Sequence, residues 1–285
     1  MKYEQAKHLK PAEFKRFWGV KLETFEQMVE IVSQKEGQKK KSGRPGKASL
    51  EDQVLMTLEY WREYRTYFHI GQTWGVTVST ACRIIRKIEK ILSQSRVFTL
   101  PGKKCLQESN TSIDAIVIDV TESPIERPKK TQKRFFSGKK KRHTLKSQVI
   151  VNQKTGEIIC TAHSQGKTHD FTLFKQSKIS LNQTIKCLVD KGYQGIQKLH
   201  ANSQVPKKKP RKGELTDLEK KRNRELARKR VVGEHINRRL KIFKILADRY
   251  RNRRKRFGLR FNLIAGLYNY ELRLSSANEI SKVYE

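Results

Sequence analysis

Three acidic side chains in this sequence occupy positions from which their carboxylates can converge. Asp119 and Asp190 each close a run of apolar residues that has the character of a β-strand. Glu234 lies four residues after Arg230 and seven before Lys241, so the helical repeat places an acid between two cations on one face. On periodicity alone this last segment is equally compatible with an ordinary salt-bridged surface. Three carboxylates so placed nevertheless have the chemistry to hold a hard divalent metal ion.

A strong positive charge indicates the class of partner. The 285 residues include 63 Lys and Arg against 28 Asp and Glu, which gives a formal net charge of +35 and a pI of about 10.2. Residues 127–146 carry ten basic and no acidic residues, and residues 206–260 carry 23 basic against six acidic residues. Cations clustered in this way favour a track for nucleic-acid phosphates over a charge that only aids solubility.

Composition also excludes several classes of protein. Hydrophobic residues make up 36% of the chain, enough for a packed core, and no run of about 18 apolar residues predicts a membrane span. The first residues lack the apolar segment of a signal peptide, so we expect a cytoplasmic protein without a membrane partner. The four cysteines form no C-x-x-C pair, and we interpret them as buried thiols.

Helical spacing of apolar residues dominates the first third of the chain. A helical element is predicted within residues 11–36, and the glycine- and lysine-rich residues 37–46 are typical of a flexible linker, with a phosphate-touching arm as the alternative. We therefore treat residues 1–48 as an N-terminal helical segment with a basic linker. Residues 49–110 follow as a separate DNA-binding domain.

The pattern within residues 49–110 is typical of a helix-turn-helix. Helices are expected over 50–64 and 66–74, followed by a turn and a third helix that Ser79 caps. A helix in this position presents its first residues to a major groove, which makes Ser79, Thr80 and Arg83 the candidate readers of base edges.

The outward face of this third helix is basic. It also carries Arg86 and Lys87 as candidate DNA contacts, with Lys90 farther along. The alternative is a three-helix packing module whose basic face is simply solvated.

From about residue 111 the periodicity changes from helical to strand-like. Strands are predicted over 115–120, 147–152, 157–162 and 185–190, and residues 152–156 are predicted to form a hairpin turn. Helices are predicted over 170–177 and 261–274, and the helix that bears Glu234 precedes the last of these. This alternation predicts an α/β domain over residues 111–285.

A lysine-rich insertion, residues 206–229, separates the strand that ends at Asp190 from the helix that bears Glu234. Both flanking elements carry candidate ligands, so the insertion must emerge beside the same site. We expect its proline-rich start to form a mobile arm that orders on DNA, and its second half to be helical; a solvated linker is the alternative. The candidate phosphate contacts of this arm are Lys207, Lys208, Lys209, Arg211 and Lys212.

The ordered combination of these motifs resembles a known enzyme family. Asp119-Val-Thr-Glu-Ser-Pro-Ile, then Gly166-Lys-Thr-His-Asp-x-x-Leu-Phe, then Asp190-Lys-Gly-Tyr-Gln-Gly, then Arg230-x3-Glu-x6-Lys is similar to bacterial insertion-sequence transposases of the DDE superfamily. Within it, the insertion-sequence-five group and its Harbinger-like relatives are the nearest in pattern. The likeness covers roughly residues 50 to 272. It departs at Ala227, where related enzymes often carry a tyrosine, so no role of that tyrosine carries over.

This resemblance implies a ribonuclease-H-like catalytic fold in which the three acids meet. It implies that Asp119, Asp190 and Glu234 are catalytic metal ligands for Mg²⁺, for which Mn²⁺ can substitute, and that Arg230 and Lys241 bind phosphate or orient Glu234. The expected reactions are cleavage at the element end and attack of the freed 3′-hydroxyl on target DNA, without a covalent protein intermediate. The implied partners are double-stranded DNA, at terminal inverted repeats and target, and further copies of the chain in a homodimer or higher oligomer.

Other polar residues near the motifs have structural interpretations. Asp170 is placed to cap a helix as readily as to bind metal, and Glu122 lies close to the first motif without a clear role. His163 and His169 have no partners at zinc-ligand spacing. A helix-turn-helix regulator, an RNA-binding protein and a domesticated nuclease remain alternatives to an active transposase, although only a nuclease explains the order of the acids.

Overall fold

The computed structural model describes residues 1–38, 46–108, 112–210 and 213–281 of the chain. The chain divides into two compact units. The first unit comprises Met1–Thr99, Leu240–Asp248 and Asn252–Glu285, and the second comprises Leu100–Arg239 and Arg249–Arg251. Among the described residues, no helix has both the length and the apolar character needed to cross a membrane.

The first unit is built of helices around an aromatic core. Its largest fully buried side chains include Trp18, Trp61 and Phe25. The helices are α1 (Tyr3–Ala6), α2 (Pro11–Trp18), α3 (Leu22–Gly37), α4 (Leu50–Glu63), α5 (Tyr67–Trp74), α6 (Val78–Gln94), α10 (Lys244–Ala247), the 3-10 helix η4 (Arg254–Arg256) and α11 (Phe257–Ser281).

Helices α5 and α6 form the predicted helix-turn-helix. Gly75 ends α5 in the left-handed region at φ +64°, and a side chain on Gly71 would meet the carbonyl oxygen of Val76 at 2.7 Å. These two positions let the turn close tightly enough for the helices to pack. The cap of α6 was predicted wrongly: Thr77 caps it, because its hydroxyl accepts a hydrogen bond from the Thr80 N–H, and Ser79 lies exposed within the first turn.

A buried ion pair joins α6 to α11 within this unit. Glu89 is fully buried, and its carboxylate accepts hydrogen bonds from Arg260 Nε at 2.6 Å, Arg256 at 2.9 Å and the Trp61 indole at 3.2 Å. Such a charge is tolerated inside a protein only when it is paired and hydrogen-bonded. The C-terminal helix therefore belongs to the core of the N-terminal unit, whereas the sequence predicts it as part of a 111–285 domain.

The second unit is a mixed sheet flanked by helices. Its elements are the 3-10 helix η1 (Lys103–Leu106), β1 (Ala115–Pro124), α7 (Gln132–Phe135), β2 (Phe136–Ser137), β3 (Arg142–Asn152), β4 (Ile158–Gln165), α8 (Asp170–Gln176), β5 (Lys186–Leu188), the 3-10 helices η2 (Lys191–Tyr193) and η3 (Ile196–Lys198), β6 (Ser203–Gln204) and α9, which runs Asp217–Leu240 and leaves this unit at its last residue.

The strand order confirms the predicted ribonuclease-H-like fold. Strand β3 lies between β4 and β1 and is antiparallel to both, and β5 and β6 then continue the sheet from β1 in parallel. The two long strands β1 and β3 extend beyond their predicted bounds at the end of the hairpin between them. That extension carries the short strand β2, which pairs with the start of β3.

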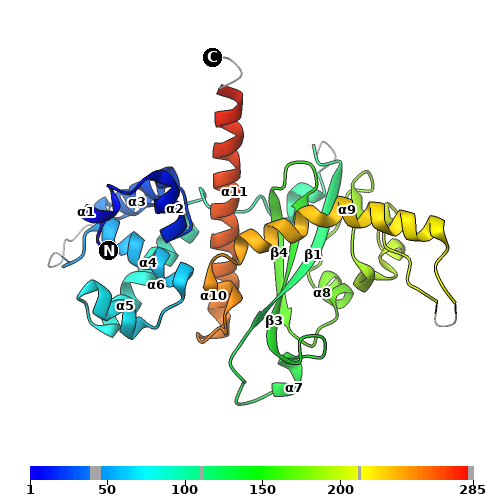
Figure 1. Ribbon diagram of the computed structural model, residues 1–285, viewed down its shortest axis with the longest axis horizontal. Helices are drawn as coiled ribbons and strands as arrows, with labels where there is room; N and C mark the ends of the chain where they lie inside the picture. The colour runs from blue at the N-terminus through cyan, green and yellow to red at the C-terminus, as the bar shows by residue number, and fades with distance from the viewer. Residues whose placement is uncertain (39–45, 109–111, 211–212, 282–285) are drawn as a thin grey trace. The chain divides into compact units, whose positions relative to one another are not determined.

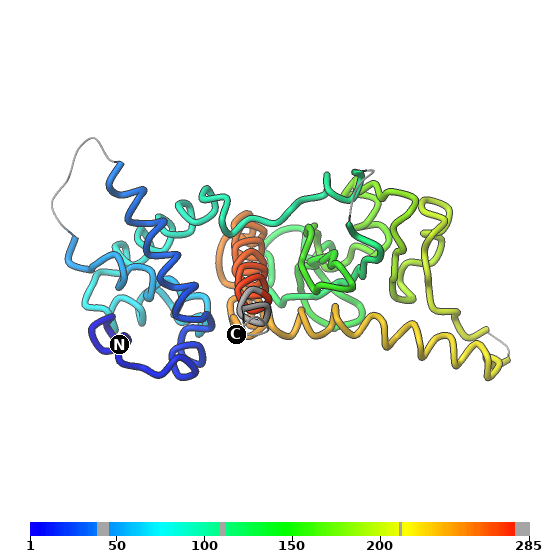
Figure 2. Tube along the Cα trace, turned by 90° about the horizontal axis from the view of Figure 1, so that it is seen from above, coloured from blue at the N-terminus to red at the C-terminus, as the bar shows by residue number. Residues whose placement is uncertain are grey.

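Helices cover the two faces of this sheet (Figures 1 and 2). On one face, Ile116 and Ile118 of β1 pack with Phe174 of α8 in the main core cluster. On the other face, Val117 and Leu188 pack against Leu226 of α9. The alternation of side chains along β1 therefore assigns Asp119, two residues after Val117, to the α9 face.

Candidate active site

Strand pairing brings Asp119 and Asp190 together. Strands β1 and β5 are parallel, with Val117 opposite Leu188. Asp119 follows Val117 by two residues, and Asp190 follows Leu188 by two residues. Because the side-chain period of a strand is two, both carboxylates lie on the α9 face, where β5 ends beside β1. Asp190 itself lies after the end of β5, where its Oδ1 accepts a hydrogen bond from Gly192 N at 2.8 Å and starts η2.

Helix α9 crosses directly over Asp119. A side chain at Gly233 would come within 3.2 Å of Val117 Cγ1 and 3.4 Å of Asp119 Cβ, so glycine permits the close approach of helix and strand. One turn later, Asn237 Nδ2 donates a hydrogen bond of 2.7 Å to Asp119 Oδ2. Positions 230, 233 and 237 thus form the face of α9 that covers the first aspartate.

Burial of Asp119 under α9 affects the pKa of its carboxyl group. Burial raises the pKa of the Asp119 carboxyl, and the negative charge of Asp190 adds to that effect. The hydrogen bonds from Asn237 and from the Val120 backbone, together with the charge of Arg230, act in the opposite direction. The site therefore holds a desolvated carboxylate whose ionised form depends on nearby donors and positive charge.

Two buried polar atoms beside Asp119 lack hydrogen-bond partners among the described residues. They are Arg230 Nε, a donor, and Asn237 Oδ1, an acceptor. Buried polar groups are normally paired, so an unpaired donor and acceptor beside two carboxylates fit a site that also binds a phosphate and a cation. The donor set of oxygen atoms is one that a hard divalent ion prefers.

Glu234 occupies the neighbouring position on α9 and is exposed. Within the described part of the chain, no three His, Cys, Asp or Glu side chains form a group ready to hold a metal ion. The structure thus brings Asp119, Asp190 and Arg230 together. Glu234 lies on α9, the helix of Arg230, with its side chain exposed. Lys241 follows the last residue of α9 and belongs to the first unit, so the expected helical face ends before it.

A second group of polar residues lies close to Asp190. A side chain on Gly192 would lie 2.9 Å from Asp190 Oδ1 and 3.1 Å from Asp170 Oδ2, so these carboxylates are near neighbours. Lys146 forms a 2.7 Å ion pair with Asp170. Burial raises the pKa of Tyr193 well above its ordinary value, and the charges of Asp170, Asp190 and Asp119 raise it further.

These contacts refine the interpretation of the remaining candidates. Asp170 stands at the start of α8, but its carboxylate pairs with Lys146, and the N-cap position belongs to His169, whose side chain caps nothing. Glu122 accepts a hydrogen bond from Thr144 Oγ1 at 2.7 Å, and His163 Nδ1 lies 3.0 Å from Ser147 Oγ. The sequence did not single out Asn237 or Lys146, although Asn237 lies seven residues after Arg230 on the same helical face.

The predicted DNA-reading surface lies in the first unit. Ser79 and Arg83 are exposed, and Arg83 Nε lies 3.4 Å from the Ser79 carbonyl, so its side chain folds toward the start of α6. Thr80 is partly buried, and Lys87 forms a 3.5 Å ion pair with Glu36. An open pocket of about 670 Å³ is lined largely by cations: Arg83, Arg86, Lys87, Lys90, Lys255 and Arg256.

The basic insertion is partly tied to α9. The Lys207 backbone exchanges two hydrogen bonds with the Asn223 side chain, at 2.9 and 3.0 Å, and its ammonium pairs with Glu219. Lys209 pairs with Glu214 at 3.1 Å, and Lys208 is exposed. Arg211 and Lys212 lie outside the described residues. The helical second half of the insertion was predicted correctly, and it continues without a break into the helix of Glu234.

Comparison with known proteins decides the family. The family described as DDE superfamily endonuclease matches residues 118–269, and the helix-turn-helix of DDE superfamily endonuclease matches residues 47–97. The chain belongs to the DDE superfamily of endonucleases. This membership confirms the resemblance drawn from the motifs, and it implies use of a divalent metal ion.

Two relatives place the chain among the insertion-sequence members of this superfamily. It is 56% identical over 276 residues to a protein of Microchaete diplosiphon named probable transposase for insertion sequence element IS702, covering 97% of this chain and all of that one. It is 23% identical over 236 residues to a protein of Streptomyces albus G described as a transposase for insertion sequence element IS112, covering 81% and 84% of the two chains. The DDE endonuclease chain thus shares almost its whole length with the first of these relatives.

Proposed function

We propose that this DDE superfamily endonuclease is the transposase of an insertion sequence, which binds the terminal inverted repeats of its element, cleaves them and transfers the strand ends into target DNA. The observation that carries the proposal is the pairing of β1 with β5, which sets Asp119 and Asp190 side by side on the α9 face, close to the charge of Arg230. A DNA-binding regulator would have no use for this arrangement.

The proposed metal ligands are Asp119, Asp190 and Glu234, and the proposed ion is Mg²⁺, with Mn²⁺ as a substitute. When bound there, the ion would supply the positive charge that neutralises the phosphate and the leaving oxygen. Asp119 and Asp190 would hold it from the strand ends, and Glu234 would reach it from the exposed flank of α9. The unpaired Asn237 Oδ1 beside Asp119 supports an additional polar contact in the same place.

The other side chains bind and orient the DNA. Arg230 would hold the phosphate through its guanidinium, whose Nε has no partner among the described residues, and Lys241 is the second proposed phosphate contact. Asn237 keeps Asp119 in position by its hydrogen bond. In the first step water attacks the phosphate at the element end, and the 3′-oxygen leaves as a free hydroxyl. In the second step this 3′-hydroxyl attacks a phosphate of the target DNA and displaces the target's own 3′-oxygen. No side chain therefore serves as a nucleophile.

Sequence recognition is assigned to the first unit. Ser79, Thr80 and Arg83 are the proposed readers of base edges, and Arg86 and Lys87 the proposed phosphate contacts. The basic residues Lys207, Lys208, Lys209, Arg211 and Lys212 are proposed to bind phosphates near the cleaved bond. Transposition joins two element ends, so we expect a homodimer or higher oligomer acting on DNA at the nucleoid.

Cleavage of a duplex that carries the element's own terminal sequence tests this proposal. We expect Asp190→Asn and Glu234→Gln to lose cleavage while binding the duplex nearly as well as the wild type, because the binding charge lies elsewhere. Asp217→Asn is the matched control, since Asp217 is an exposed acid at the start of α9. Chelation of divalent ions should abolish wild-type cleavage, and Mg²⁺ should restore it. Full cleavage by Asp190→Asn would overturn the assignment.

A further inference from the structure

The hairpin end of the second unit carries a basic pocket that the proposed chemistry does not use. It is open, has a volume of about 720 Å³, and lies among α7, β2 and the ends of β3 and β4. Its lining, all within the described residues, includes three cations and no carboxylate; its side chains are Arg127, Gln132, Lys133, Phe136, His143 and Lys167. This volume falls in the range of sites for small organic groups.

An aromatic pair contributes to the lining of the pocket. Phe136 and His143 are directly paired across β2 and β3, and their rings meet edge to face with centroids 5.7 Å apart. Phe136 is 42% exposed although it is a large apolar side chain. An exposed aromatic ring surrounded by cations is the combination on which nucleic-acid bases stack while their phosphates are held.

The fold positions the cations around this ring. Gly166 lies so close to the neighbouring hairpin that a side chain there would come within 2.6 Å of the Phe135 carbonyl oxygen. The next residue, Lys167, donates its backbone N–H to the Arg134 carbonyl at 3.1 Å, which fixes it beside α7. Arg127 Nε donates to Gln132 Oε1 at 2.9 Å. The close approach at Gly166 thus places Lys167 in the lining of the pocket.

The pocket and the carboxylates share one face of the sheet. Asp119 pairs with Val149 of β3, and His143 lies six residues before Val149, an even number, so both side chains project to the α9 face. Six residues of strand span about 20 Å, which equals the rise of about six nucleotides in B-DNA. A DNA strand that follows β3 from Asp119 reaches the pocket within one helical turn of the cleaved bond.

We infer that this pocket binds one nucleotide of the DNA strand whose base has left the helical stack. Inside a duplex a protein reaches only the edges of bases, so a side chain can stack on a base only after that base is extruded. Phe136 and His143 receive the base, and Arg127, Lys133 and Lys167 hold its phosphate and those beside it. The inference rests on the proposed function, because it takes DNA as the substrate.

Binding of the full-length protein to two kinds of duplex tests the inference without requiring cleavage. One duplex carries the paired terminal sequence of the element; the others carry a single unpaired nucleotide at successive positions within one turn of the cleaved end. The wild type should prefer one position of the unpaired nucleotide. Phe136→Ala should lower the affinity for that duplex by between about fivefold and a hundredfold, because stacking of one base is lost. The affinity of the same variant for the fully paired duplex should stay within about twofold of the wild type.

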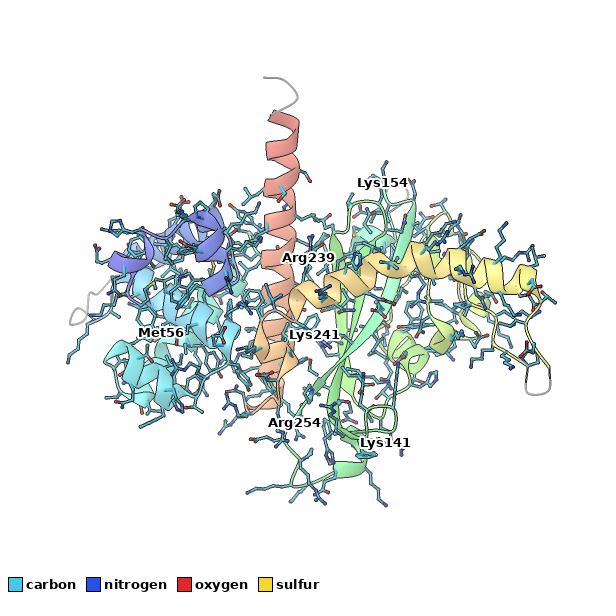
Figure 3. All side chains as sticks on the ribbon, in the orientation of Figure 1. Met56, Lys141, Lys154, Arg239, Lys241 and Arg254 are labelled. Carbon is cyan, nitrogen blue, oxygen red and sulfur yellow. The ribbon has the colours of Figure 1, made fainter. Side chains whose placement is uncertain are left out.

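Matched variants separate stacking from charge and from folding. Phe136→Trp should keep the preference, and Leu199→Ala, an exposed apolar truncation elsewhere in this unit, should keep it too. Lys167→Ala should weaken binding to both duplexes and should make the fall of log affinity with log salt less steep by about 0.9. Lys154→Ala, at the opposite end of the β3–β4 hairpin from Lys141 (Figure 3), should leave that slope unchanged.

Two results would overturn the proposed nucleotide pocket. The first is a wild type that binds no position of the unpaired nucleotide better than the paired duplex; the second is an equal loss of affinity for both duplexes in Phe136→Ala. The second result would reduce the pocket to a phosphate contact. Cleavage of the paired duplex is scored separately. Cleavage without any preference would retain the proposed transposase and remove the nucleotide pocket, whereas preference without cleavage would retain the pocket and contradict the proposed activity.

Discussion

Asn237 of α9 donates a 2.7 Å hydrogen bond to Oδ2 of Asp119 on β1, and this bond joins the helix of the third proposed metal ligand to the strand of the first. Asn237 is nearly buried, and its other amide atom has no partner among the described residues. A carboxylate that is oriented by such a neighbour needs no rearrangement before it binds a cation.

Replacing Asn237 by Leu should therefore impair catalysis more than folding. Loss of the neighbour that orients a metal-binding carboxylate typically costs 10- to 100-fold in metal affinity or activity. We expect the Mg²⁺ concentration for half-maximal cleavage to rise by about that factor, with DNA binding unchanged. His235→Ala, an exposed residue two positions earlier, is the control. An unchanged Mg²⁺ requirement in Asn237→Leu would show that the bond is only structural.

The stability of an Asp119→Asn variant offers a second test. Burial raises the pKa of this carboxyl above its ordinary 3.8, so the ionised form costs free energy in the folded protein. In metal-free buffer near neutral pH, Asp119→Asn should therefore be more stable than the wild type.

The pH dependence gives the sign of this effect. The advantage should be fully present above the raised pKa and should disappear as the pH falls toward the ordinary value, where the wild-type carboxyl is protonated in both states. Thermal melting of both proteins across that pH range is the measurement. A less stable Asp119→Asn at neutral pH would indicate that Arg230 and Asn237 outweigh the cost of burial.

Two basic residues of α6 should differ in their effect on DNA recognition. Arg83 folds toward the start of the helix, the end that we propose enters a major groove, whereas Lys90 lies about two turns farther along. Arg83→Ala should weaken binding to the element end by about 1 to 3 kcal/mol more than binding to random duplex. Lys90→Ala should weaken both alike. Equal losses on both duplexes for Arg83→Ala would leave it as a phosphate contact.

The basic segment before α9 predicts a change in salt dependence. Replacing Lys207, Lys208, Lys209, Arg211 and Lys212 together by Ala should flatten the fall of log affinity with log salt by about 0.9 for each phosphate contact that is lost. Because Lys207 and Lys209 already pair with acids, we expect less than the full effect of five contacts. An unchanged slope with unchanged cleavage would restore the interpretation as a solvated linker.

The local features of this protein are easier to predict from its sequence than the contacts between residues far apart in the chain. The ends of apolar runs predict Asp119 and Asp190, because a strand that is buried on both faces is visible in its composition. The cap of α6 was missed because Thr77 and Ser79 are both suitable caps, and only the turn at Gly71 and Gly75 decides between them. Asn237 could not be told from any other polar helical residue, since its partner lies 118 positions away.

The division of the chain was hidden for the same reason. The sequence predicts a boundary near residue 110 and a single domain after it, whereas the structure returns residues 240–248 and 252–285 to the first unit. Nothing in the local pattern of α6 shows that Glu89 is buried, because its cationic partners follow it by 167 and 171 residues. Only tertiary packing reveals such a pair.

That buried pair also sets the order in which the protein can mature during its own synthesis. The ribosome makes the helix-turn-helix before the C-terminal helix, and until Arg256 and Arg260 are added, Glu89 would be an uncompensated charge in its core, a defect that costs about 3 to 5 kcal/mol. The helix-turn-helix therefore reaches its native state only after residues 256 and 260 have been synthesised. A chain that stops before these residues would lack a stable helix-turn-helix, so firm DNA binding through that motif would require a chain that already contains most of the DDE endonuclease region.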